Sequence, residues 1–119
     1  MDKQALGREG ERLAKEFLER QGYRILARNY RYSGGEVDII AKKDDELCFV
    51  EVRSRWLAQH GHPLETITRP KQKRVIRVAE YYLAQEGIAE QPVSFGAIGI
   101  VFSPDEEPDI SFVPDAFMA

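Results

Sequence analysis

The chain has 119 residues, of which 43% are hydrophobic and 31% are charged, and its formal net charge is −3. This composition excludes a disordered or low-complexity chain and predicts one folded domain over residues 1–119, long enough to bury roughly two thirds of its unfolded surface. The single cysteine, Cys48, excludes an internal disulfide, and its place inside an apolar strand favours a buried thiol over a reactive one.

Membrane insertion and export are not expected from this sequence. The chain has no apolar run near the ~20 residues that a membrane-spanning helix needs. Residues 1–17, MDKQALGREGERLAKEF, are polar and charged, unlike a secretory signal or a transit peptide. We therefore expect a cytoplasmic protein without a membrane partner.

Charge is divided unevenly along the chain. All 17 lysine and arginine residues lie in residues 1–77, where 12 acidic residues leave a net charge of +5. Residues 78–119 carry the other 8 acidic residues and no lysine or arginine, a net charge of −8. The asymmetry indicates a basic face for a polyanion such as nucleic acid, although the pI of about 5.4 is far from that of a typical basic binder. Solvated charge on both halves is the alternative interpretation.

The first half of the chain predicts a helix followed by three strands. Residues 3–21 place apolar side chains at the i, i+3, i+4, i+7 spacing of one buried helical stripe, and the glycine that follows ends the helix. Residues 23–29 favour a strand and residues 31–35 a turn. Residues 37–42 and 47–53 then resemble the two strands of a hairpin joined by the polar turn KDDE.

The second half predicts one more helix and two more strands. Residues 56–66 have no clear period and are expected to form a loop. Thr68 is expected to cap a helix that has a proline in its first turn and ends near Gly87. Residues 93–102 and 110–113 are expected to be strands. The resulting order, α-β-β-β-α-β-β, predicts an α/β fold in which a central mixed β-sheet is flanked by helices.

Two of the predicted strands, EVDIIA and LCFVEVR, carry acidic residues among apolar ones. Because side chains alternate along a strand, Glu36 and Asp38 share one face of the first, and Glu51 and Arg53 share one face of the second. Pairing through the KDDE turn would bring Asp38 and Glu51 close together at one end of the sheet. Two close carboxylates need a positive partner, either a cationic side chain or a hard divalent ion such as Mg²⁺. The ion would polarise a phosphodiester and activate water, whereas a structural cluster of ion pairs would need no ion.

The two predicted helices bring further charge to the same region. Glu11 lies at the edge of the buried stripe of the first helix, from where it could reach toward the sheet. Lys71 and Gln72 continue the buried stripe of the second helix toward its N-terminus, where the helix dipole favours anions. The residues expected to hold a phosphate backbone are Arg69, Gln72, Lys73, Arg74 and Arg77, together with Arg55.

An early-helix glutamate followed by GEVD and FVEVR resembles the PD-(D/E)XK nuclease superfamily, which has the restriction-endonuclease-like fold, and especially its archaeal Holliday-junction resolvase branch. From end to end the chain is similar to the small bacterial YraN-like family. The matching stretches are GREGERLAKEFLERQGYRILARNYR, GGEVDIIA, FVEVRSR, TRPKQKR and ISFVPDAF, which together cover most of the chain.

The resemblance implies a role for each matched residue. Asp38 matches the metal-binding acid of the superfamily, Glu51 its second acid, and Glu11 the helix glutamate of the resolvases. The backbone carbonyl of Val52 would be a further ligand of Mg²⁺ or Mn²⁺. Arg53 stands where the motif usually has a lysine.

Arg53 is the main departure from that motif, because a lysine can lose its proton to orient or activate water, whereas an arginine stays charged. Arg53 could stabilise the phosphate instead, with Lys71 supplying the missing ammonium group from the second helix. Alternatively, Arg53 could pair with the acids in a purely structural cluster. Gly96 is a second departure, since the family often has an acid after the phenylalanine that matches Phe95.

Other polar and aromatic residues are weaker candidates for a functional site. His60 and His62 could ligate a metal, but two histidines on a loop without cysteine or aspartate partners are usually only polar. Trp56 is expected either to stack on a base or to be buried. Tyr81 and Tyr82, adjacent on the second helix, are expected to pack against the core.

The sequence thus leads to three hypotheses about function. The first is a Mg²⁺-dependent endonuclease that hydrolyses phosphodiesters in DNA, in particular branched or structured DNA, and acts as a homodimer by analogy with the resolvases. The second is a catalytically inactive module that keeps the nuclease fold and binds nucleic acid or another partner. The third is a protein-binding domain that uses the acidic C-terminal half.

Overall fold

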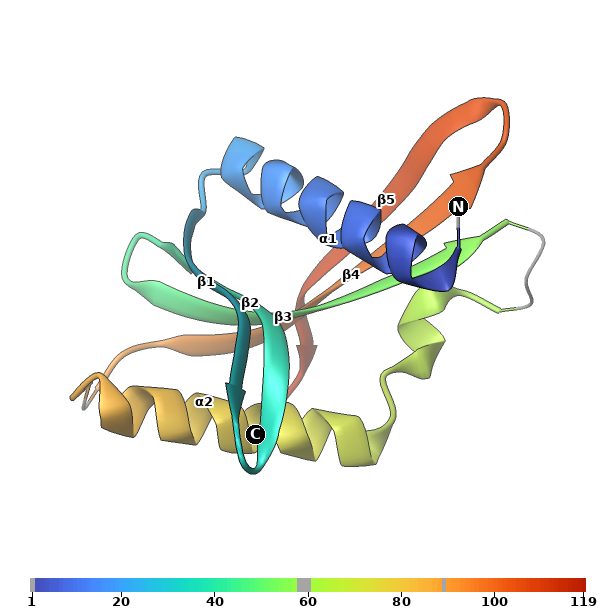
Figure 1. Ribbon diagram of the computed structural model, residues 1–119. Helices are drawn as coiled ribbons and strands as arrows, with labels where there is room; N and C mark the ends of the chain where they lie inside the picture. Colours follow the sequence, from blue (N-terminus) through green and yellow to red (C-terminus); the bar gives the residue numbers. More distant parts are fainter. Residues whose placement is uncertain (1, 58–60, 89) are drawn as a thin grey trace.

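The computed structural model describes residues 2–57, 61–88 and 90–119. Its helices and strands follow the expected order, with a 3₁₀ helix in addition between the third strand and the second α-helix (Figure 1). Within these ranges no helix is long and apolar enough to cross a membrane. The elements are α1 (Lys3–Arg20), β1 (Arg24–Tyr32), β2 (Gly35–Lys43), β3 (Glu46–Trp56), η1 (Pro63–Thr66), α2 (Arg69–Gln85), β4 (Val93–Ser103) and β5 (Glu106–Phe117).

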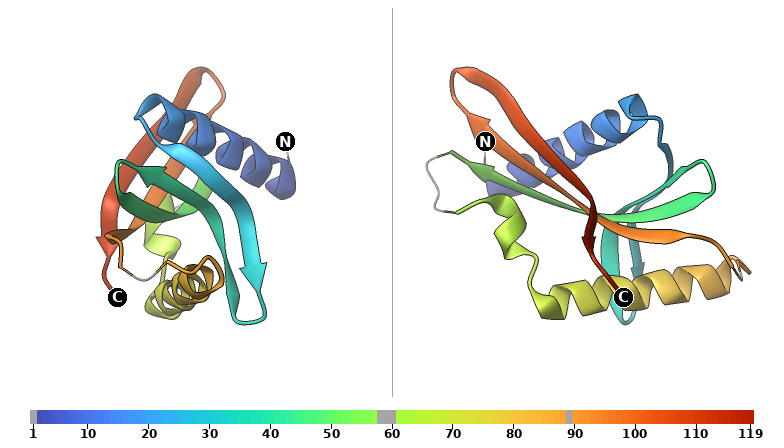
Figure 2. Two further views of the ribbon diagram at one scale, coloured as in Figure 1. Left: turned by 90° about the vertical axis from the view of Figure 1, so that its left-hand side faces the viewer. Right: turned by 180° about the vertical axis from the view of Figure 1, so that it is seen from behind.

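The strands of the described residues form one five-stranded sheet in the order β1-β2-β3-β4-β5. Strands β3 and β4 pair in parallel, and all other neighbours are antiparallel. A parallel pair needs a crossover connection, which η1 and α2 supply. The two α-helices cover opposite faces of the twisted sheet (Figures 1 and 2). The prediction of an α/β fold with a mixed sheet flanked by helices is confirmed, and the arrangement is consistent with a restriction-endonuclease-like fold.

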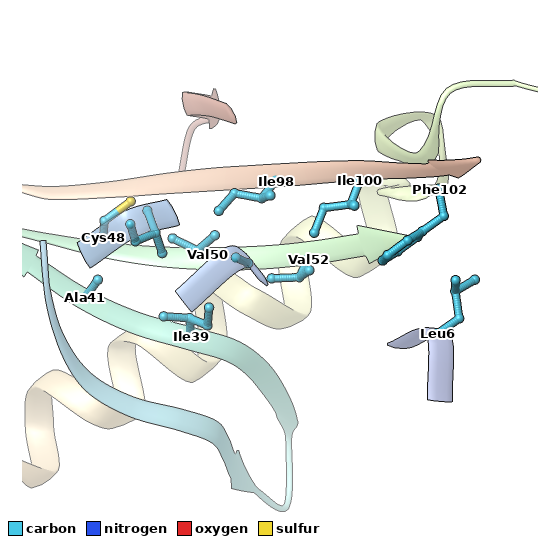
Figure 3. Packing of buried hydrophobic residues seen from close by; sticks show 11 residues of the cluster. Leu6, Ile39, Ala41, Cys48, Val50, Val52, Ile98, Ile100 and Phe102 are labelled. Atoms are coloured by element: carbon cyan, nitrogen blue, oxygen red, sulfur yellow. The ribbon is translucent and has the colours of Figure 1, made fainter. Parts of the chain in front are cut away.

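Helix α1 packs one apolar stripe against one face of the sheet. Its buried residues are Leu6, Gly10, Ala14 and Leu18, at the spacing predicted from the sequence. Three of them join a cluster of buried side chains from β2, β3 and β4, in which Leu6 and Phe102 lie at the same end (Figure 3). Cys48 belongs to this cluster, so the prediction of a buried thiol is confirmed, and burial raises its pKa.

Local contacts set the bounds and the position of α1. Asp2 Oδ1 accepts a hydrogen bond from the backbone N–H of Ala5 (2.7 Å) and caps the first turn, and Gly22, with φ of +95°, follows the end of the helix as predicted. Where α1 crosses β3, a Cβ added to Gly10 would lie 1.8 Å from Ser54 Oγ. A larger residue at position 10 would therefore displace the Ser54 hydroxyl, which is buried without a hydrogen-bond partner among the described residues.

Helix α2 covers the opposite face and closes a second cluster of buried residues. Thr68 is its N-cap residue, as predicted, although the Thr68 side chain makes no capping hydrogen bond. The ring of Tyr82 meets the ring of Phe49 edge-on, with 5.8 Å between ring centroids, which confirms the prediction that Tyr82 packs in the core. The buried residues of α2 are Val75, Val78, Ala79 and Tyr82.

Two predicted boundaries in the middle of the chain are wrong. Residues 56–66 are not simply a loop, because β3 extends to Trp56, which pairs with Phe102 of β4, and Pro63–Thr66 form η1. The turn predicted over residues 31–35 is shorter, because the ends of β1 and β2 pair across it and leave only two residues between the strands.

The last strand was also predicted too short, over residues 110–113, whereas β5 spans Glu106–Phe117. Its prolines, Pro108 and Pro114, fall where the pairing with β4 shifts register. A proline at a bulge on an edge strand removes no ladder hydrogen bond, so β5 tolerates both.

Candidate functional site

The β2–β3 hairpin places Asp38 and Glu51 where the two strands separate. Regular Cα pairing between the strands ends at Ile39 and Val50. Just beyond that pair, Asp38 Oδ2 accepts a hydrogen bond from the backbone N–H of Val52 (2.8 Å). A side-chain carboxylate therefore satisfies a strand donor that the ladder leaves unpaired, and this bond fixes the position of Asp38.

The side chain of Arg53 turns back onto this junction. Its Nη1 atom lies 2.9 Å from the carbonyl oxygen of Val52, 3.4 Å from Glu51 Oε2 and 3.5 Å from Asp38 Oδ2. The two contacts with carboxylates are longer than a strong charge-assisted hydrogen bond, which measures about 2.7–2.9 Å. Three oxygen atoms from two strands thus converge on one cationic nitrogen of Arg53. This nitrogen partly neutralises the two carboxylates, but its contacts with them are long.

Glu51 is the buried acid of the pair, with 8% of its side chain exposed. Burial raises the pKa of Glu51 to about 9, helped by its hydrogen bond with Asp38 and by the Asp38 charge, and opposed by Arg53. The protonated form of Glu51 is therefore favoured at neutral pH, beside Asp38 and the Arg53 guanidinium.

Glu11 of α1 lies near this pair but is not part of it. Burial, followed by the charge of Asp38, raises the pKa of Glu11, while a hydrogen bond with Asn29 and the charge of Arg28 lower it. In the described ranges, no three histidine, cysteine, aspartate or glutamate side chains are gathered closely enough to hold a metal ion together. The charge of Asp38 therefore acts on Glu11, which is not a third carboxylate at the same point.

A pocket of about 560 Å³ opens over the acid pair, a volume in the range of small-molecule sites. It lies between the β1–β2 turn, the end of β3 and the first half of α2, and the β1–β2 hairpin reaches α2 in both Figures 1 and 2. Helix α2 contributes two cations to the pocket, so Lys71 does reach the region of Asp38 and Glu51. The lining residues are Arg31, Tyr32, Ser33, Gly35, Glu36, Asp38, Glu51, Arg53, Lys71 and Arg74, and we call this the acid pocket.

The donor atoms of the acid pocket fit a hard divalent ion. Two carboxylates and the carbonyl of Val52 supply oxygen ligands, the kind that Mg²⁺ and Mn²⁺ prefer, and the pocket leaves room for water. Binding would require Glu51 to lose its proton and Arg53 to leave the point on which the oxygens converge.

The residues predicted to bind a phosphate backbone differ in their surroundings. Arg74 lines the acid pocket. Arg69 Nη1 donates a hydrogen bond to Gln72 Oε1 (3.3 Å), and Gln72 Nε2 donates one to the carbonyl of Ile67 (3.2 Å). Gln72 thus helps to fix the start of α2. Lys73 and Arg77 are exposed and lie outside the lining of the acid pocket.

The remaining candidates from the sequence have structural partners. His62 Nδ1 accepts a hydrogen bond from the backbone N–H of Leu64 (3.2 Å) and caps η1, whereas His60 lies outside the described residues. Tyr81 stacks on Tyr32 with 4.5 Å between ring centroids, so it packs on β1 while staying partly exposed at the surface. Arg55 and Trp56 line a second pocket, which is described below.

Three lining residues of the acid pocket, Arg31, Tyr32 and Ser33, were not predicted as site residues. They belong to RYSGG, which leads directly into GEVD. This turn leads into the strand that carries Asp38 only a few residues later, so the proximity could have been inferred from the sequence.

Gly96, the second departure from the family motif, lies in the core of the sheet. A Cβ added there would meet Cys48 Sγ at 3.1 Å and the ring of Phe112 at 3.3 Å. Gly96 also faces the register shift in β5 next to Pro114. The present packing therefore leaves no space for an acidic side chain at this position.

A mixed sheet between two helices, with an acid pair on its central hairpin and cations from the crossover helix above it, defines a restriction-endonuclease-like α/β domain. The chain belongs to the family described as "Uncharacterised protein family UPF0102", whose profile matches residues 10–100. This is the YraN-like family of the PD-(D/E)XK nuclease superfamily, so the resemblance found in the sequence is confirmed.

Similarity to curated relatives extends over nearly the whole chain. A UPF0102 protein from Prosthecochloris aestuarii is 44% identical and covers 96% of this chain and 94% of its own length. A UPF0102 protein from Clostridium perfringens is 41% identical over 95% of this chain and 93% of its own length. One from Caldicellulosiruptor saccharolyticus is 41% identical over 98% of this chain and all of its own length, 100%.

Proposed function

We propose that this protein is a divalent-metal-dependent endonuclease that hydrolyses phosphodiesters in DNA, with branched or structured DNA as its substrate. The observation that supports this most is the convergence of Asp38, Glu51 and the Val52 carbonyl on a single cationic atom, inside a pocket that also contains Lys71 and Arg74. Carboxylates with cations above them suit a negatively charged phosphate that is bound together with a divalent ion.

Asp38, Glu51 and the Val52 carbonyl would hold Mg²⁺ or Mn²⁺, with Glu11 as an accessory or water-mediated partner. Such an ion polarises a phosphodiester and lowers the pKa of water, and so supplies the nucleophile. The Val52 N–H keeps the Asp38 carboxylate in one orientation before any ligand arrives.

The cations of the acid pocket would bind the phosphate. Arg53 cannot act as a base because it stays protonated, but it can leave the carboxylates and pair with phosphate oxygens in two parallel hydrogen bonds. Lys71 approaches the same point from α2 and supplies the ammonium group that the usual motif lysine would provide. Arg74 would contact the next part of the backbone, and the exposed Arg77 and Lys73 would add sequence-independent attraction.

A branched substrate has two equivalent strands to cut, so this proposal includes a two-fold homodimer. Light scattering on the purified protein at several concentrations tests that part independently of any activity.

A second candidate function is a catalytically inactive module that keeps the nuclease fold and binds nucleic acid or a protein partner. The position of Arg53 favours it, because this side chain already neutralises the acid pair without an ion. In this case the acid pair and Arg53 stabilise the fold, and the exposed cations bind the partner.

One comparison separates these functions. Supercoiled plasmid, single-stranded DNA, RNA and a four-way junction are incubated with the protein in Mg²⁺, Mn²⁺ or EDTA. Cleavage that requires the ion and is lost in Asp38→Ala and Glu51→Ala supports the endonuclease, with Glu36→Gln as the matched control because Glu36 is an exposed acid that pairs with Arg31 in the same pocket. Salt-dependent binding without cleavage supports the inactive module, and no binding to any nucleic acid rules out both nucleic-acid functions.

A further inference from the structure

A second pocket of about 530 Å³ lies on the other side of Arg53 from the acid pair. It is lined by the start of α1, the end of β3, η1 and the start of α2, all of which lie on the right-hand side of the molecule in Figure 1. It shares Arg53 and Lys71 with the acid pocket, so the two pockets adjoin along these side chains. We call it the basic pocket, and its lining residues are Lys3, Leu6, Arg53, Ser54, Arg55, Trp56, Pro63, Thr66 and Lys71.

The basic pocket has an excess of positive charge. Four of its lining residues are lysine or arginine, and none of the described lining residues is acidic. Lys3 and Lys71 make no ion pair with a carboxylate in the described part of the chain. Glu65 lies near Arg55, because a Cβ on Gly61 would be 2.7 Å from the Glu65 carboxylate and 3.5 Å from Arg55 Nη1, and Arg53 already contacts Asp38 and Glu51. Lys3 and Lys71, which have no carboxylate partner among the described residues, keep the pocket attractive to an anion.

The same pocket has an apolar, aromatic wall. Trp56 is half-buried, and its ring lies 6.0 Å from that of Phe102, inclined at 57°. Leu6 and Pro63 complete this wall, and Figure 3 shows Leu6 and Phe102 together at the end of the core cluster. The core thus supports an indole ring that also faces a group of cations. Aromatic rings beside cations are the combination with which proteins bind unpaired nucleotides, because every base has a flat face and every phosphate a charge.

We infer that the basic pocket binds one nucleotide of a single DNA strand, adjacent to the phosphate in the acid pocket. Lys3, Arg55 and Lys71 contact its phosphate, and its base stacks on Trp56. The base must leave a duplex to enter, so the preferred substrate has an unpaired nucleotide beside the cleavage position. The placement next to a scissile phosphate depends on the proposed endonuclease function, whereas the nucleotide binding itself does not.

The test uses Trp56 as its own probe, since it is the only tryptophan in the chain. Its fluorescence is followed in EDTA while thymidine, inorganic phosphate, thymidine 5′-monophosphate or 5′-phosphorylated dithymidylate is added. We expect quenching to saturate with the two nucleotides, with the dinucleotide binding more tightly, and to be weak with thymidine or phosphate alone. Lys3→Ala is expected to weaken dinucleotide binding roughly fivefold or more and to lower the salt slope by about one.

Lys15→Ala is the matched control, because Lys15 is on the same helix but pairs with Glu19 away from both pockets. Equal binding in the Lys3→Ala and Lys15→Ala proteins would overturn the inference, as would equal affinity for phosphate and nucleotide. Tighter binding of the mononucleotide than of the dinucleotide would make a free nucleotide the ligand and refute the strand assignment. Quenching without cleavage would refute only the endonuclease function, because no metal ion enters this measurement.

Discussion

Replacing Glu51 by glutamine should stabilise the protein at neutral pH. The buried Glu51 carboxyl has a pKa raised from 4.5 to about 9, so the folded state holds a proton that the unfolded chain releases. A group of this kind lowers the free energy of unfolding as pH rises from the unfolded to the folded pKa. Between the unfolded pKa of 4.5 and pH 7, the free energy of unfolding falls by about 1.4 kcal/mol per pH unit, or about 3 kcal/mol in total. Glutamine keeps the shape and a hydrogen-bond donor toward Asp38 but cannot ionise.

We expect Glu51→Gln to raise the free energy of unfolding at pH 7 by about 1–3 kcal/mol. Rearrangement of Asp38 and Arg53 around the neutral amide offsets the rest of the cost. Urea unfolding of both proteins at several pH values from about 5 to 8.5 measures it. The gain should be small near pH 5 and increase with pH, since only the natural protein loses stability over this interval.

A gain that does not change with pH would refute this reasoning, because burial of an ionisable group would then not be its cause. A loss of stability at pH 7 would show that ionised Glu51 stabilises the fold through Arg53. The same substitution should abolish metal-dependent cleavage, so stability and activity would change in opposite directions, as is common for residues kept for function.

Three further changes test other parts of the site. Arg53→Lys should increase Mn²⁺-dependent cleavage of plasmid DNA about tenfold or more, because lysine can lose a proton near water, and cleavage at or below the natural level would contradict this. Mn²⁺ should raise the melting temperature more at about pH 8.5 than at about pH 6, since Glu51 must lose its proton to bind it. Asp38→Asn, which can still accept the Val52 hydrogen bond, should remove this stabilisation. Ser54→Ala should stabilise the fold by roughly 1 kcal/mol in thermal unfolding, because the Ser54 hydroxyl is buried without a partner among the described residues.

The features that follow from periodicity were predictable. The buried stripe of α1 and the apolar face of α2 repeat at helical spacing, and the short KDDE turn fixed the register that brings Asp38 opposite Glu51. The 3₁₀ helix and the full length of β5 were missed, because prolines usually indicate the end of an element. In β5 each proline coincides with a bulge, which only the pairing with β4 reveals.

The details of the site depend on side-chain positions and on burial, which a single sequence does not give. The contact of Arg53 with the carbonyl of its neighbour Val52 depends on the side-chain rotamer of Arg53. The proton on Glu51 results from burial between the sheet and α2. Lys3 was missed because it is 50 residues before Arg53 in the sequence, and only the crossing of α1 over β3 brings both to the same pocket.

The guanidinium of Arg53 is a built-in counterion for the acids Asp38 and Glu51. Metal sites built only from acids often need the ion in order to fold, because the ligands repel one another when it is absent. Here the Arg53 guanidinium lies between the two acids, so we expect chelators to leave the circular dichroism spectrum unchanged and, under the proposed function, to stop cleavage. Under the proposed function, this protein would fold without magnesium or manganese and would need the ion only for cleavage.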